Sequence, residues 1–229
     1  MNVELCLKKY SGDFFRFMFG YNTIDEKKSY SDGKEFLEKY SIDSIAFQNE
    51  CKPIMKQVFK MDEKQKYDME TMPIDALFYP DYCFFTYFSS HIFSKEDFLL
   101  IKDICRKYNE KFIYIIEREG CEDYPEAAFK LKIPVDISWE SLNEGGCITD
   151  VIFHFMQNDY YVFGDSGCWG KWCDYDNAII DYETFAYKWE TEPIIDYKKY
   201  FGISTEELLN IKGIPTSLKK SFIICEDTV

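Results

Sequence analysis

The stretch that decides the fold is residues 82–117, YCFFTYFSSHIFSKEDFLLIKDICRKYNEKFIYIIE. It starts and ends with runs of aromatic and branched residues, YCFFTYF and KFIYIIE, which are typical of buried strands. Between them, Ser94 precedes two acids and a series of apolar residues that recur with the 3.6-residue period of a helix. The stretch therefore predicts a strand, a helix and a second strand in succession.

Further strands are predicted on both sides of this unit. Residues 133–140, IPVDISWE, alternate apolar and polar side chains as a half-buried strand does. YYVFG at 160–164 follows an Asn-Asp pair that predicts a hairpin turn. Residues 42–48, IDSIAFQ, are a shorter strand candidate, and the chain after Gly170 reads as irregular and acidic.

Residues 1–73 carry mainly helical signals. In GKEFLEKY at 33–40, the preceding Asp32 and the glutamate three positions on have the spacing of a capping box. We therefore predict a single α+β domain over residues 1–229, in which helices pack on a mainly antiparallel sheet. Within it, residues 1–73 are a candidate helical subdomain and the rest of the chain, from residue 74, is the sheet-rich body.

The composition limits the class of partner. The chain has 41 acidic and 27 basic residues, and the resulting net charge of −14 repels nucleic acid and anionic lipid but suits a basic partner. Nine cysteines are scattered, several of them within apolar runs, and neither a secretory signal nor an apolar run of transmembrane length is evident. These features predict a cytoplasmic protein with free thiols that binds neither nucleic acid nor membrane.

The most unusual motif is Gly-Asp-Ser-Gly at residues 164–167, a run that also surrounds the nucleophile of some serine hydrolases. His154, in a predicted strand, could face Ser166 and contribute to a Ser-His-Asp arrangement. The spacing differs from that of the Gly-x-Ser-x-Gly elbow, however, and no helix is predicted to follow the motif. Its two glycines more simply permit a tight turn in which the aspartate and the serine bond to backbone groups, so the motif predicts a structural turn.

Signals for a metal or a cofactor are weak. Cys147, His154, Cys168 and Cys173 can be drawn as a zinc set, but only the last two have a short spacing, and structural zinc sites usually have two such pairs. The sequence therefore predicts no metal and no cofactor, and it assigns no catalytic residue.

Residues 159–196 combine acidic and aromatic side chains. They hold nine acids, two bases and ten aromatic residues, so half of the net charge lies in this segment. Tryptophan and tyrosine surrounded by polar groups are common at protein-binding hot spots, and acids speed the encounter with a basic partner. The alternative is that the rings pack inward and the acids only solvate the surface. The expected contact residues are Asp165, Trp169, Trp172, Asp174, Tyr175, Asp176, Asp181 and Glu183.

The run DYYVFGDSGCWGKWCDYDN at residues 159–177, with the VDISWE segment before it, resembles a group of small bacterial cytosolic proteins. These look like the immunity proteins that are encoded beside polymorphic or contact-dependent toxins. The resemblance spans roughly residues 74–200 and is sharpest from Tyr160 to Gly170, whereas the continuation KWCDYDN departs from the pattern. It implies a non-enzymatic inhibitor that binds its cognate toxin, and many such toxins are basic nucleases. It assigns no binding residues.

Two functions from different classes follow. We expect an acidic binding protein that neutralises a basic toxin domain by occluding it. The alternative is a hydrolase that uses Ser166 with His154, or the carboxylates of Asp165, Asp174 and Asp176 with a divalent metal. A structural subunit that self-associates through exposed rings is a third interpretation.

Overall fold

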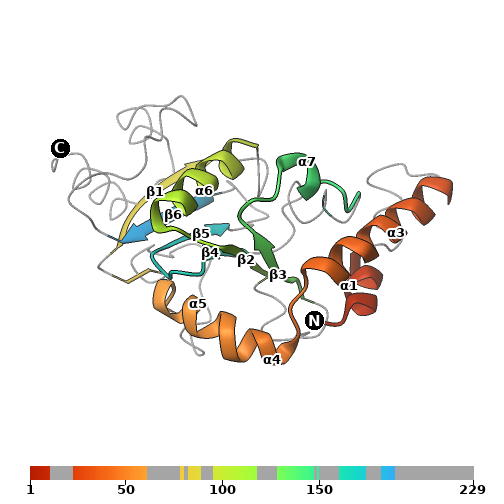
Figure 1. The fold of residues 1–229 in the computed structure, drawn as a ribbon, viewed down its shortest axis with the longest axis horizontal. Helices are drawn as coiled ribbons and strands as arrows, with labels where there is room; N and C mark the ends of the chain where they lie inside the picture. The colour runs from red at the N-terminus through yellow and green to blue at the C-terminus, as the bar shows by residue number, and fades with distance from the viewer. Residues whose placement is uncertain are drawn as a thin grey trace.

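Figure 1 shows the computed structural model of the chain. The structure describes residues 1–10, 23–60, 78–79, 82–88, 95–117, 128–146, 149, 160–173 and 182–188. Within these residues the strands form one antiparallel sheet with helices packed on it, which confirms the predicted α+β class.

The strands of this sheet all pair antiparallel, in the order β1-β6-β5-β4-β2-β3. They are β1 (Tyr82–Phe88), β2 (Phe112–Glu117), β3 (Lys130–Pro134), β4 (Tyr160–Gly164), β5 (Trp169–Cys173) and β6 (Tyr182–Lys188). The predicted strand-helix-strand unit is present, but its two strands are not neighbours. Strands β4, β5 and β6 pair between β1 and β2, so the chain returns to fill the middle of the sheet.

Helices cover both faces of the sheet (Figure 1). α6 (Lys95–Tyr108) lies on one face and has acids in its first turn and bases in its last, as the helix dipole favours. α4 (Ser44–Ala46), the π-helix η1 (Phe47–Cys51) and α5 (Lys52–Val58) follow one another along the other face. α1 (Val3–Tyr10) and α3 (Thr23–Tyr40) lie side by side beyond β3, and α7 (Trp139–Leu142) follows β3 in the chain.

Close packing on the α5 face of the sheet explains the glycine in the middle of β5, Gly170. Phe59, directly after α5, contacts Tyr161 and Phe163 of β4, with ring centroids 4.8 and 6.0 Å apart. Gly170 pairs with Phe163, and a Cβ added to Gly170 would lie 2.5 Å from Val58 Cγ1 and 2.7 Å from Phe59 Cζ. The end of α5 therefore packs directly on bare backbone, which a side chain at this position would prevent.

One hydrophobic cluster joins the N-terminal helices to the sheet, because it contains residues of α1, α3, α5 and α6 as well as of the strands. Cys6, Cys51 and Cys105 are free thiols buried in or beside this core, and Cys168 is a partly exposed free thiol. In the described segments, no helix combines the length and the apolar character that crossing a bilayer requires.

Two of the predicted strands differ in the structure. Residues 44–48 are helical, and of residues 133–140 only the first two lie in a strand and the last two in a helix. Residues 42–48 lead into α4 and η1, because Asp43 caps α4 by accepting a hydrogen bond from the amide three positions on, at 2.7 Å. Residues 133–140 start at the end of β3 but then turn into α7, where Ser138 caps the helix in the same way at 3.0 Å. In both segments a capping side chain starts a helix where the sequence predicts a strand.

Two further expectations are corrected. The chain from Gly170 to Ser204 was predicted to be irregular, but its described residues form strands, because β5 continues to Cys173 and β6 pairs on both sides. Acidic residues disfavour a strand prediction in this region, but its strands are stabilised by pairing with their neighbours in the sheet. Helix α3 begins at Thr23, so Asp32 lies within the helix and does not cap it. The predicted Asn-Asp hairpin turn lies outside the described residues.

The core contains a fully buried ion pair between the sheet and α6. Lys171 Nζ of β5 lies 3.2 Å from Asp97 Oδ1 of α6, and both side chains have an exposed fraction of 0%. An isolated charge in an apolar interior costs several kcal/mol, so each of these groups depends on the other. The pair therefore helps to fix the position in which α6 packs on the centre of the sheet.

We predict that removing one partner of this pair destabilises the fold more than removing both. Asp97→Leu should lower the free energy of unfolding by about 3–5 kcal/mol, because it leaves the buried ammonium group without its counter-charge. Adding Lys171→Met should recover most of that loss, because two well-packed apolar side chains often replace a buried pair at little cost. Urea denaturation of the three proteins measures these differences, and losses that simply add in the double variant would contradict the account.

Candidate functional site

The end of α6 places a glutamate beside the turn between β4 and β5. Asn109 follows the helix with a φ of 54°, in the left-handed region that asparagine adopts more readily than most residues. Glu110 N donates to Cys105 O at 2.9 Å, and Asn109 N donates to Arg106 O at 3.3 Å, which is the Schellman pattern of a helix C-terminus. This arrangement directs the chain out of the helix, so that Glu110 lies directly before β2.

The Gly-Asp-Ser-Gly motif forms the tight turn that joins β4 to β5, as the sequence predicts. Gly167 has a φ of 65°, in the region that favours glycine, and its N–H donates to Gly164 O at 3.4 Å. Tyr82 Oη, at the start of β1, donates to Gly167 O at 2.6 Å, and the Gln57 side chain lies against Gly167. The turn is therefore held by β1 and α5 as well as by its own strands.

The Glu110 carboxyl group binds this turn. Its Oε1 accepts hydrogen bonds from Trp169 Nε1 at 3.0 Å and from Ser166 Oγ, and its Oε2 accepts one from Ser166 N at 2.7 Å. A Cβ added to Gly164 would collide with this carboxyl group and would lie 2.5 Å from Trp169 Nε1. Glu110 is only 9% exposed, so its carboxyl group is a buried acceptor surrounded by the backbone and side chains of the turn.

Asp165 makes the reciprocal connection from the turn to β2. Its Oδ1 accepts hydrogen bonds from Lys111 N at 2.8 Å and from Phe112 N at 3.0 Å. The carboxyl group of Asp165 is also close enough to that of Glu110 for each to affect the pKa of the other. We call the reciprocal bonds made by these two acids the carboxyl clasp.

The environments of the two carboxyl groups move their pKa values in opposite directions. Burial and the neighbouring Asp165 raise the pKa of Glu110 to about 7, against the lowering effect of the Ser166 donors. Burial also acts to raise the pKa of Asp165, but the neighbouring Glu110 and hydrogen bonds from the amides of Phe112 and Lys111 outweigh it and lower that pKa below its usual value.

The two tryptophans expected at the contact surface lie inside the protein. Trp169 has an exposed fraction of 0% and Trp172 of 4%, and their strand neighbours Tyr161 and Phe163 are also buried. The rings of β4 and β5 thus pack inward, and the expectation that these indoles are free to touch another molecule is wrong. Within the described part of the chain, Trp172 Nε1 has no hydrogen-bond partner.

The acidic residues of the expected contact surface are placed differently. Asp165 is partly exposed and belongs to the carboxyl clasp. Glu183 lies on β6, where its backbone pairs with Cys173 of β5. Asp174, Tyr175, Asp176 and Asp181 lie outside the described residues, in the segment of sequence that joins β5 to β6.

Ser166 has a carboxyl group rather than an imidazole as its partner. Its hydroxyl donates to Glu110 Oε1 and accepts a hydrogen bond from Cys168 N at 3.1 Å. His154, the base of the hydrolase alternative, lies outside the described residues, as does Cys147 of the drawn zinc set. Among the side chains that are described, no group of three His, Cys, Asp or Glu residues is arranged to hold a metal ion.

Glu110 is the site residue that sequence reasoning missed. One signal was present, because an asparagine after a helical pattern is a common C-terminal cap and the next residue then leaves the helix. The pairing of β2 with β4, which begins at Ile113 and Gly164, brings Glu110 to the Gly-Asp-Ser-Gly turn. No local sequence pattern predicts the pairing of these two strands.

The net charge is unevenly distributed along the chain. Residues 159–196 contain nine acids and two bases, which is half of the net charge of −14. The segment 174–181 lies within this range and has three acids and no base.

Comparisons of the chain with protein-family models, with curated proteins and with solved structures find no match.

We predict that Ser166→Ala lowers the free energy of unfolding by about 1–3 kcal/mol. The variant removes a hydroxyl donor from the buried Glu110 carboxyl group and the acceptor of the Cys168 amide, and buried groups left without partners carry a cost of that size. Urea denaturation followed by tryptophan fluorescence measures the change. Ser31→Ala, at an exposed position of α3, is the matched control and should change stability by less than about 0.5 kcal/mol. Equal effects of the two substitutions would contradict a structural role for Ser166.

Proposed function

We propose that this chain is a non-enzymatic acidic protein that binds a basic protein partner. The finer proposal, which rests on the resemblance of residues 159–177, is an immunity protein that neutralises a cognate bacterial toxin by occluding it. The observation that carries the proposal is the charge distribution along the sequence, in which residues 159–196 hold nine acids and two bases, half of the net charge of −14.

Concentrating acids in one segment of the sequence favours recognition of a basic surface. Concentrated negative charge attracts a basic partner over roughly one Debye length, about 8 Å at physiological ionic strength, and raises the rate of encounter. The affinity of such a complex should therefore fall as the salt concentration rises.

The segment 174–181 is the central part of the proposed contact surface. Strand β5 ends at Cys173 and β6 begins at Tyr182, and the pairing of Cys173 with Glu183 holds both ends of the segment in the sheet. The two buried tryptophans of β5 then have a supporting role, because they anchor the strand that leads into the segment. The contact residues we propose are Asp165, Asp174, Tyr175, Asp176, Asp181 and Glu183.

The hydrogen bonds of Ser166 bear on the hydrolase alternative. A nucleophilic serine is usually paired with a general base that accepts its proton, and here the hydroxyl donates to a carboxyl group that also binds the turn backbone. That arrangement supports a structural function for the motif. A fluorophosphonate probe tests the alternative directly, because labelling of the wild type that disappears in Ser166→Ala would favour a hydrolase.

The test of the proposed function uses the protein encoded by the adjacent gene as the binding probe. Wild-type protein should bind it and restore growth of cells that express it. The triple variant Asp174→Lys, Asp176→Lys, Asp181→Lys should weaken binding on the order of 100-fold, because three contact charges are reversed. Isothermal titration calorimetry at two salt concentrations measures the affinity.

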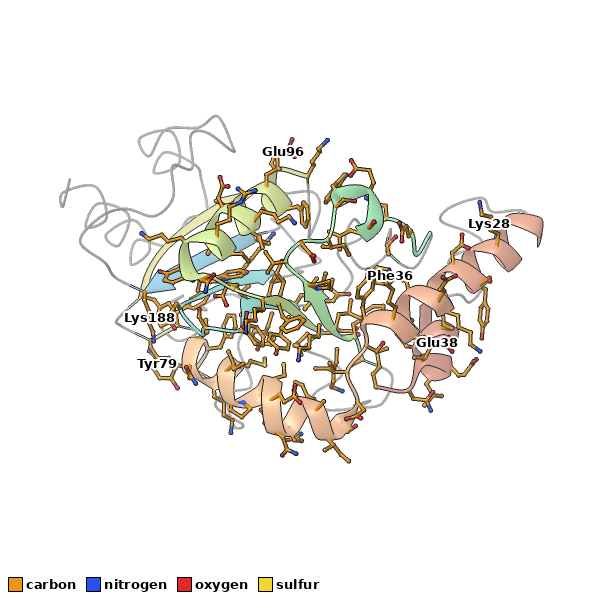
Figure 2. The ribbon with its side chains drawn as sticks, viewed as in Figure 1. Lys28, Phe36, Glu38, Tyr79, Glu96 and Lys188 are labelled. Carbon is orange, nitrogen blue, oxygen red and sulfur yellow. The ribbon has the colours of Figure 1, made fainter. Side chains whose placement is uncertain are left out.

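A matched variant separates the contact surface from a general effect of charge. Glu38→Lys, Glu96→Lys, Glu140→Lys changes the net charge by the same amount at exposed positions of the body, two of which are labelled in Figure 2. This control should bind within about threefold of wild type, because distant surface charges contribute little. Equal losses in both triple variants would reject the assigned contact surface, and absence of wild-type binding would reject the partner.

A further inference from the structure

We draw no further inference here: the strongest candidate, the outer edge of the sheet along β1, where the sequence YCFFTYF has neither a charged residue nor a proline, carries none because nothing in the described part of the structure shows what covers that edge.

Discussion

Burial of the Glu110 carboxyl group is the constraint on which this end of the sheet depends. A carboxyl group that is nearly removed from water must receive hydrogen bonds, and the turn supplies them from a serine hydroxyl, a backbone amide and an indole. The same requirement explains the glycine at position 164, because any larger residue would occupy the space of the carboxyl group. The Gly-Asp-Ser-Gly motif, which suggests a nucleophile when read alone, is thereby explained as the partner of an acid 56 residues away from Ser166.

Polar groups also organise the interior elsewhere. The Lys171–Asp97 pair connects the centre of the sheet to α6, and the buried Glu117 carboxyl group accepts a hydrogen bond from Phe129 N at 2.9 Å. Such groups contribute less to stability than apolar packing does, but they penalise every arrangement in which they lose their partners. The excess of acid is concentrated along the sequence, because residues 159–196 hold half of the net charge of −14. This concentration is the physical basis for proposing a basic partner.

Local sequence patterns correctly predicted the helices and strands with a regular apolar period. They failed where the structure of a segment depends on tertiary packing. The strand, helix and strand of 82–117 were evident from runs of aromatic residues and a 3.6-residue period, and the turn at 164–167 from its glycines. Residues 42–48 were predicted wrongly because the side chain of Asp43 caps a helix that begins at Ser44. The inward packing of Trp169 and Trp172 could not be read locally, because whether a ring in a strand faces the core depends on which strands and helices flank it.

The most direct test of the account is a pKa measurement for Glu110 by carboxyl carbon NMR. Protein labelled at the glutamate side-chain carboxyl carbon, with Glu110→Gln used to assign the resonance, is titrated across the range in which carboxyl groups ionise. The account predicts that Glu110 titrates near pH 7, well above the value of about 4.3 for a glutamate in a model peptide. A Glu110 resonance that titrates near the model-peptide value would show that the carboxyl group is solvated, and the clasp could not then have the geometry described.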